Sequence, residues 1–305
     1  MKEKPYQLKD HLLTALLASK EAGQAILDVY ERDFDVSYKE DLSPLTLADQ
    51  RSHIIIVDHL TDPSGERFPI LSEEGKGIPF EERRKWDYFW LIDPLDGTKE
   101  FIKRNGEFTV NIALINQHRP VLGVIFVPVN NVFYFASEGF GAYRLKNGHA
   151  LELLKSNVSA MKRDDTLKEI LKQSDRLPYY DTPLDTHNSQ LVIVGSRSHP
   201  SKEFEAFVET MRKKHKKVEV VSSGSSLKLC LVAEGKADIY PRLGPTMEWD
   251  TAAGQAIVEQ ANGSVLNYET GEPLQYNKKN LLNSWFIVQT HNNYSFLEAD
   301  TYLDL

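Results

Sequence analysis

The sequence predicts an α/β protein with an α+β N-terminal half and an α/β C-terminal half. Two stretches with helical periodicity open the chain, apolar strands joined by short polar turns follow, and strands alternate with helices from residue 189 onward. Short connections favour antiparallel pairing, whereas helix–strand alternation is typical of α/β sheets. We therefore expect one domain at 1–155, a connecting segment at 156–188 and a second domain at 189–305.

The N-terminal half is expected to begin with two helices. Apolar residues recur at helical spacing from about 7 to 30, which predicts an amphipathic helix. A second helix comes next, and Ile54, Val57 and Leu60 are expected along one side of it.

Strands are predicted in the next part of the chain. The segments at 68–75 and 89–93 predict short strands that end in acids. Three longer apolar segments, FTVNIALI, RPVLGVIFVPV and VFYFASEG, predict antiparallel strands, because only short polar turns such as the one at Asn130 and Asn131 divide them.

A polar segment at 151–188 interrupts this pattern, and we expect one short helix in it, near 165–173. Alternation then begins, with a strand at 191–196, a helix at 202–214 and a strand at 218–223.

The rest of the C-terminal half continues the alternation. LKLCLVAEG predicts a helix, ADIYPRL a strand, and TAAGQAIVEQANG a helix that Gly263 is expected to cap. A final hairpin is expected to turn at 269–271.

Composition and charge narrow the class of protein. The chain has 305 residues and a formal charge of −8, with 44 acids against 36 bases, which argues against a general nucleic-acid binder. One cysteine, Cys230, excludes an internal disulfide and a multi-cysteine metal cluster, and is typical of a reducing cytosol. No stretch approaches the ~18 apolar residues of a spanning helix, so we expect a soluble, cytoplasmic protein without integral membrane association.

Acidic residues stand where predicted strands or loops end. Asp49, Glu73 and the pair Asp93 and Asp96 are the candidates. Function often lies at such ends, because rigid elements direct their side chains into one crevice. Pro94 is expected to stop the strand ladder, so that the acids on either side turn toward one point. Clustered carboxylates need a cation, and oxygen ligands select Mg²⁺ or Mn²⁺ over zinc.

Gly97 and Thr98 follow directly and suggest phosphate chemistry. Free backbone N–H groups at the start of a helical turn would cradle a phosphate, and the Thr98 hydroxyl would orient a water. Acids and an anion nest on one loop predict metal-assisted phosphate chemistry. A plain tight turn is an alternative, since Asp-Pro and Asp-Gly are common turn formers. The spacing of the acids disfavours the nucleophilic Asp-x-Asp of haloacid dehalogenases, and the sequence holds no EF-hand loop.

Three motifs in order, LSEEG at 71–75, WLIDPLDGT at 90–98 and EWDTAAG at 248–254, resemble the lithium-sensitive, Mg²⁺-dependent inositol monophosphatase superfamily. The match covers nearly the whole chain apart from 151–188. The resemblance implies a layered αβαβα sandwich, the sugar-phosphatase fold, and hydrolysis of a phosphomonoester by direct in-line attack of water.

The resemblance also assigns roles to single residues. The metal ligands that it implies are Glu73, Asp93, Asp96, Asp250 and the Leu95 carbonyl. They would hold about two or three Mg²⁺ ions, for which Mn²⁺ would substitute. Asp49 would hold Thr98, which would orient the attacking water together with Glu73. Substrate would lie against Gly97, Thr98 and Asp250, although Asp250 taken alone is typical of a helix N-cap.

The stretch 222–254 is more specific, and with SPLTLAD and GSRSH it resembles the CysQ-type 3′(2′),5′-bisphosphate nucleotidases. That resemblance implies that Ser225, Lys228 and Arg242 contact a phosphonucleotide and that His199 approaches the adenine. It implies removal of the 3′-phosphate of 3′-phosphoadenosine 5′-phosphate to give AMP and phosphate, with 3′-phosphoadenylyl sulfate as a second substrate. A fixed arginine and lysine suit a second phosphate.

Two alternatives stay open. An inositol or sugar monophosphatase of the same fold is one, and the SSLK and PRLGP segments argue against it. A non-catalytic phosphonucleotide sensor is the other, and the water-orienting pair of Asp49 and Thr98 argues against it. The resemblance also implies a role in sulfur metabolism and allows peripheral contact with the inner face of a membrane. Glu248 is expected as an additional acid near the site.

Overall fold

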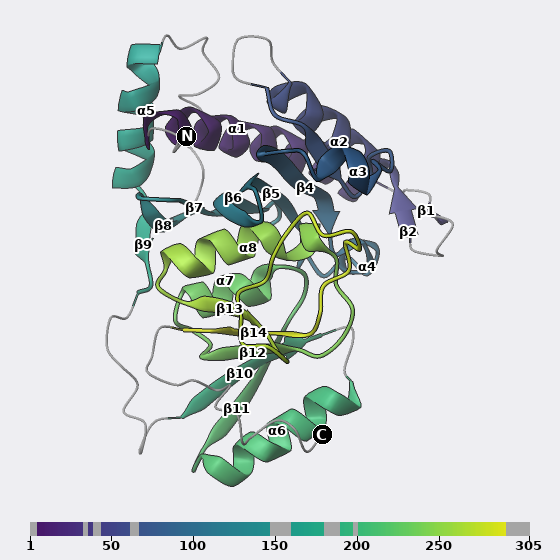
Figure 1. The fold of residues 1–305 in the computed structure, drawn as a ribbon, viewed down its shortest axis with the longest axis vertical. Coiled ribbons are helices and arrows are strands. Elements are labelled where there is room, and N and C mark those ends of the chain that lie inside the picture. Colours follow the sequence, from purple (N-terminus) through teal and green to yellow (C-terminus); the bar gives the residue numbers. More distant parts are fainter. Residues whose placement is uncertain are drawn as a thin grey trace.

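Helices and sheets alternate in five layers, which confirms the predicted αβαβα sandwich (Figure 1). In order, the layers are α1 (Pro5–Tyr30) with α2 (Leu47–Leu60), a seven-stranded sheet, α7 (Leu227–Ala233) with α8 (Glu248–Gln260), a five-stranded sheet and α6 (Lys202–Lys214). The computed structural model describes residues 5–32, 36–38, 44–61, 67–146, 160–179, 190–197 and 201–290. A membrane-spanning helix is absent from these ranges, since none of their helices has the necessary length and hydropathy.

The first layer consists of the two helices predicted at the N-terminus. In α2 the predicted apolar side was wrong at one position, because Ile54 is 58% exposed whereas Ile56 is fully buried. Ile56 follows Asp49 and Ser52 at helical spacing, and all three face the protein interior. The helix therefore directs polar as well as apolar side chains toward the protein interior. Helix α5 (Ala160–Lys172) packs against the end of α1 (Figure 1).

The seven-stranded sheet has the order β3-β4-β5-β6-β7-β8-β9. Its strands are β3 (Ile70–Ser72), β4 (Tyr88–Asp96), β5 (Thr109–Asn116), β6 (Arg119–Val127), β7 (Val132–Ser137), β8 (Gly141–Lys146) and β9 (Asp175–Leu177). Neighbours from β4 to β9 pair antiparallel, as predicted for the apolar run, whereas β3 and β4 run parallel. Helix α5 and strand β9 come from the expected connecting segment at 156–188 and add to this half. The domain boundaries themselves stay a prediction.

Strand β4 contains a bulge that positions two of the predicted acids. Asp93 lies opposite Asn111 and Asp96 lies opposite Thr109, with a register shift between these two pairs. Asn111 and Thr109 are two residues apart and share one face of β5, so the acids opposite them share that face as well. The prediction that Pro94 ends the ladder was wrong, because the strand continues through the bulge. The extra residue, not the end of the strand, brings both carboxylates to one side.

Helices α7 and α8 fill the layer between the two sheets. α8 lies so close to β6 that a Cβ added at Gly123 would be 2.3 Å from the Ala253 carbonyl oxygen, so this contact requires a glycine. The predicted cap of α8 was wrong by one residue. Asn262 has the positive φ, 64°, that Gly263 was expected to supply. Asparagine adopts this conformation more readily than most side chains.

The five-stranded sheet has the order β11-β10-β12-β14-β13. Its strands are β10 (Leu191–Ser196), β11 (Val218–Ser223), β12 (Ile239–Arg242), β13 (Ser264–Asn267) and β14 (Phe286–Gln289). β10 runs parallel to β11 and β12, whereas β14 runs antiparallel to β12 and β13. The Gly271 N–H donates to the Asn267 carbonyl at 2.9 Å, as a turn at 269–271 requires. The expected hairpin is confirmed, because Leu266 and Pro273 form an antiparallel bridge across this turn and the Asn267 N–H donates to the Glu272 carbonyl at 2.8 Å. β13 also pairs with β14, across a loop of residues 268–285.

Four short elements complete the description. β1 (Val36–Tyr38) and β2 (Pro44–Thr46) pair antiparallel, while α3 (Phe80–Arg83) and α4 (Thr98–Ile102) flank β4 in the sequence.

Three clusters of buried side chains hold the layers together. The first joins α1 and α2 to the seven-stranded sheet, and Trp90 is among its members. The second fills the space around α7 and α8 between the two sheets, and the third joins the five-stranded sheet to α6 through side chains such as Phe207. Because burial of apolar area dominates folding, both sheets are fixed against the central helices, and the site described below lies between them.

Candidate active site

A cavity of about 470 Å³ lies where β4, the start of α8 and loops of the C-terminal half meet. Side chains from both halves of the chain line it. The predicted site residues among them are Glu73, Asp93, Asp96, Gly97, Thr98, Ser225, Lys228, Arg242 and Asp250. The fold therefore brings segments far apart in the sequence to one place.

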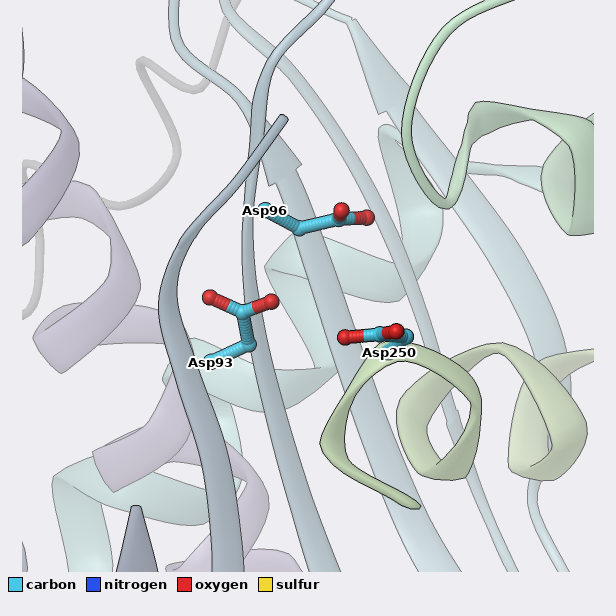
Figure 2. A group of neighbouring side chains, drawn as sticks. All are labelled: Asp93, Asp96 and Asp250. Carbon is cyan, nitrogen blue, oxygen red and sulfur yellow. The ribbon is translucent and has the colours of Figure 1, made fainter. Parts of the chain in front are cut away.

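Asp93, Asp96 and Asp250 form the acidic end of the cavity. One carboxylate oxygen from each lies within 4.8 Å of the other two. Figure 2 shows the three side chains directed into one space, two from β4 and one from the first turn of α8. Asp93 is buried, whereas Asp96 and Asp250 are half-buried at the cavity wall.

Burial, together with the proximity of other carboxylates, raises the pKa of these three acids. Burial raises the pKa of Asp93 well above its ordinary value, and the nearby carboxylates of Glu73 and Asp96 raise it further. Burial likewise raises the pKa of Asp250, and the charge of Asp96 adds to the shift. Burial also raises the pKa of Asp96, although the Lys228 ammonium opposes the shift. Protonation or a cation must therefore offset the charge of the cluster.

The donor atoms fit a hard divalent cation. The acidic end offers carboxylate oxygens, and the described residues that line the cavity include no histidine or cysteine. Backbone groups hold two of the carboxylates in place: Asp93 Oδ1 accepts from the Leu95 N–H at 3.0 Å, and Asp250 Oδ2 accepts from the Met247 N–H at 2.8 Å. Hydrogen bonds of this kind, made to the ligand carboxylates by groups that do not bind the metal themselves, orient the carboxylates for a metal ion.

Glu73 reaches the same cavity from the next strand. It directly follows β3, and its N–H donates to the Ile92 carbonyl at 3.2 Å, which extends the pairing with β4. Because β3 and β4 run parallel, their carboxyl ends lie at the same edge of the sheet. The Ser72 hydroxyl, at the end of β3, is 2.9 Å from His53 Nδ1 on α2.

Asp49 and Thr98 are in contact, as the resemblance implied. The Thr98 hydroxyl donates to Asp49 Oδ1 at 3.3 Å. Asp49 Oδ2 accepts from the Thr46 N–H at 2.7 Å and from the Thr46 hydroxyl at 2.6 Å, which caps α2. Asp49 is buried, so the cap fixes the carboxylate and the carboxylate fixes Thr98. With its proton directed to Asp49, the Thr98 oxygen can accept a hydrogen bond from a water in the cavity.

A turn at residues 223–226 brings the C-terminal half onto this acidic end. Ser225 has a φ of 46°, an unfavourable value for a residue other than glycine. This conformation allows the Ser226 N–H to donate to Asp96 Oδ2 at 2.6 Å. Gly97, with a φ of 91°, packs on the turn, since a Cβ added there would be 3.1 Å from the Ser225 Cβ.

Lys228 and Arg242 are the cations predicted to bind a second phosphate, and both line the cavity. Lys228 is not on a solvated helix face but is buried, with its Nζ donating to the Ser225 carbonyl and lying 5.5 Å from the centre of the Tyr240 ring. Burial lowers the pKa of Lys228 to about 8, while the Asp96 carboxylate opposes the shift. Arg242 donates from Nη2 to the Pro245 carbonyl at 2.7 Å.

The other predicted residues lie elsewhere. Leu95 is buried, and its carbonyl oxygen lies 3.4 Å from the Thr98 hydroxyl oxygen. His199 lies outside the described residues. Glu248 does not line the cavity: it is buried and accepts from the Asn277 N–H at 2.6 Å and from Lys278 Nζ at 2.7 Å. Its contacts tie the loop after β13 to α8.

Several polar residues of the site were not anticipated. The Ser226 hydroxyl donates to Asn111 Oδ1 at 2.9 Å, and it lies 2.8 Å from the Thr109 hydroxyl. Asn111 Nδ2 is 3.4 Å from Asp96 Oδ2. The sequence did hold a signal for Thr109 and Asn111, since these two polar residues alternate with apolar residues at the start of a mainly apolar strand. A serine in a serine-rich turn carries little information by itself.

Comparison with known proteins agrees with this geometry. The model of the inositol monophosphatase family matches residues 8–297. A layered sandwich with an acidic cluster at its strand ends, together with this match, defines the class, and the chain belongs to the inositol monophosphatase family.

Within that family, the similar curated proteins include 3′(2′),5′-bisphosphate nucleotidases. CysQ of Shigella flexneri, which bears that name, is 41% identical over 276 residues, covering 90% of this chain and 97% of the relative. The crystal structure of CysQ from Bacteroides thetaiotaomicron matches with a TM-score of 0.80 and 47% identity, covering 93% of this chain and 98% of that one. Thermotoga maritima IMPase, at 22% identity and a TM-score of 0.67 over 92% of both chains, supports the fold.

Proposed function

We propose that the protein is a Mg²⁺-dependent 3′(2′),5′-bisphosphate nucleotidase that hydrolyses the 3′-phosphate of 3′-phosphoadenosine 5′-phosphate to give AMP and phosphate. The names and the identity of the CysQ relatives support this activity. A second substrate of the same chemistry would be 3′-phosphoadenylyl sulfate. We also propose a cytoplasmic location, which the single cysteine favours.

The observation that carries the proposal is that one cavity holds both an acidic cluster and two cations. Lys228 and Arg242 line the same cavity as Asp93, Asp96 and Asp250, and Lys228 is near enough to Asp96 to oppose the rise of its pKa. A substrate with two separated phosphates matches this layout, since one phosphate needs the acidic end and the other needs fixed cations.

An adjoining cavity of about 210 Å³ offers a place for the nucleoside. Tyr240 and Arg242 line both cavities, and Phe204 and Leu243 add apolar surface to the smaller one. A purine next to the second phosphate would lie against these side chains, because planar bases favour aromatic and apolar surfaces. An inositol phosphate has neither a base nor a second phosphate to fill this space.

Mg²⁺ fits the donor set, and Mn²⁺ would substitute because it takes similar oxygen ligands. Glu73, Asp93, Asp96, Asp250 and the Leu95 carbonyl would hold about two or three ions. When bound, the cations would lower the pKa of water and polarise the phosphate that is cleaved.

The chain's own residues would bind and orient the reactants. Gly97 and Thr98 begin α4, where free N–H groups favour a phosphate. The Thr98 oxygen, whose proton points to Asp49, would accept a hydrogen bond from the attacking water, and Glu73 would accept the other. Attack in line with the departing 3′-oxygen then needs no covalent enzyme intermediate, because the water itself is the nucleophile.

The test is phosphate release from 3′-phosphoadenosine 5′-phosphate and from inositol 1-phosphate, side by side with Mg²⁺ and with or without Li⁺. We expect a strong preference for the nucleotide and inhibition by Li⁺. Preference for inositol 1-phosphate would favour an inositol or sugar monophosphatase. Tight nucleotide binding without phosphate release would favour a non-catalytic sensor.

A further inference from the structure

Glu107 connects the two halves of the chain beside the cavity. It lies between α4 and β5 in the N-terminal half, and both oxygens of its carboxylate reach residues of the C-terminal half. Oε2 accepts from the Gly224 N–H at 2.7 Å, and Oε1 pairs with Arg197 Nη2 at 2.8 Å. We call this set the Glu107 latch (Glu107, Gly224 and Arg197). One half-buried side chain thus contacts the residues that directly follow β10 and β11.

The two halves are also in close contact at this point. A Cβ added at Gly224 would lie 2.8 Å from the Cγ of Glu100 and 3.0 Å from the Cβ of Glu107. Such distances are too short for a side chain, so the glycine allows the loop to approach the carboxylate closely. The approach makes the Gly224 N–H available to Glu107 and leaves little room for the loop to shift.

The latch holds the turn at 223–226 at Gly224, and this turn carries groups that are proposed to bind phosphate. Ser225 follows Gly224 in an unfavourable left-handed conformation, and the Ser226 N–H donates to Asp96. Lys228 is in turn held by the Ser225 carbonyl. Backbone strain of this kind persists only where neighbouring contacts fix the chain, and the Glu107 contact fixes it one residue before Ser225.

We propose that Glu107 is a positioning residue for bisphosphate nucleotides: its carboxylate fixes the turn at 223–226 and thereby the separation of Lys228 from the acidic end of the cavity. This inference rests on the proposed function. A small phosphomonoester needs the acidic cluster alone, whereas a substrate with two phosphates needs the cluster and the cation Lys228 at one fixed distance from each other. Loss of the latch therefore weakens binding of the bisphosphate selectively.

Glu107→Ala tests the latch by steady-state kinetics on two substrates, 3′-phosphoadenosine 5′-phosphate and a small phosphomonoester. We expect KM for the nucleotide to rise by about tenfold or more, equivalent to about 1.4 kcal/mol. KM for the small ester should stay within about twofold. Glu138→Ala is the matched control, since Glu138 also pairs with an arginine, Arg119, but that pair lies between β6 and the end of β7 and not at the turn at 223–226. It should leave the ratio of the two KM values unchanged.

Two further variants separate the contacts of the latch. Glu107→Gln keeps an oxygen for the Gly224 N–H but loses the charge that pairs with Arg197. We therefore expect its KM for the nucleotide to lie between the values of the wild-type protein and Glu107→Ala. Arg197→Ala removes the ion pair and also the hydrogen bond from Arg197 Nη2 to the Ser222 carbonyl at 3.1 Å, so it should raise the nucleotide KM at least as much as Glu107→Gln. The double variant should be no worse than Arg197→Ala alone. Arg197 is 48% exposed, so this variant keeps the test valid if Glu107→Ala does not fold.

The outcomes distinguish the latch from the proposed function. Wild-type protein that cleaves the nucleotide, combined with equal KM changes on both substrates in the Glu107 and Arg197 variants, would overturn the latch alone. Unchanged KM values in these variants would overturn it too. Wild-type protein that releases no phosphate from the nucleotide would overturn the proposed function, and the role of Glu107 in selectivity with it.

Discussion

Replacing Asp250 with Asn should stabilise the metal-free protein while it removes activity. Asp250 shares the acidic end with Asp93 and Asp96, and unit charges 4.8 Å apart repel by about 3.5 kcal/mol at an effective dielectric constant of about 20. Part of this repulsion is already relieved, because the raised pKa values let the cluster hold protons. We therefore expect a gain of about 1–2 kcal/mol, which raises Tm by a few degrees. The asparagine oxygen can still accept from the Met247 N–H, so the helix cap is kept.

The assay is thermal unfolding of both proteins with and without Mg²⁺, together with turnover. In Asp250→Asn we expect the Mg²⁺-dependent rise in Tm to shrink and turnover to fall by about 10²–10³-fold. Asp238→Asn is the control, because Asp238 is also buried and accepts from the Val192 N–H at 2.7 Å, but does not line the cavity. It should keep both turnover and the response to Mg²⁺. An Asp250→Asn variant with near-normal turnover and an undiminished response to Mg²⁺ would refute the reasoning.

The remaining predictions concern pH and the second phosphate. Burial raises the pKa of Asp93 and Asp250 in the folded state, so the folded protein holds protons that the unfolded chain has released. The contribution of these two groups to the stability of the metal-free protein should therefore be greatest below about pH 4 and should fall as the pH rises toward the raised pKa values. Mg²⁺ should flatten this dependence. Unfolding measured across pH, with and without Mg²⁺, checks both expectations. Lys228→Ala should raise KM for the bisphosphate nucleotide by about 10–100-fold and change KM for a simple phosphomonoester far less, as expected when a charged hydrogen bond is lost. Equal changes on both substrates would exclude its role at the second phosphate.

Elements with a strong periodic pattern could be predicted to the residue. β10, α6 and β11 span the residues expected for them, because their apolar spacing is regular and polar residues mark their ends. The bulge in β4 could not be predicted, since Pro94 indicates an interruption but not whether the strand resumes beyond it. The exposure of Ile54 depends on which side of α2 is turned to the sheet, and tertiary contacts of Asp49 and Ser52 decide that.

The acidic part of the site could be predicted from the sequence more readily than the rest of the site. Asp93 and Asp96 stand in one short motif at a strand, and the adjacent Thr98 and the second acidic strand end at Glu73 argued against a plain tight turn. Glu248 carries the same charge next to a site residue, yet contacts with Lys278 and Asn277 turn it away from the cavity. The contact of Ser226 with Asp96 joins residues 130 positions apart, and no local pattern encodes such a distance.

The most direct measurement is the identity of the nucleotide that the protein forms from 3′-phosphoadenosine 5′-phosphate with Mg²⁺. Chromatography or phosphorus NMR distinguishes AMP from adenosine 3′-phosphate. If the acidic end cleaves the 3′-phosphate while Lys228 and Arg242 hold the 5′-phosphate, AMP and one equivalent of phosphate accumulate together. Adenosine 3′-phosphate as the product, or no product at all, would contradict the proposed function.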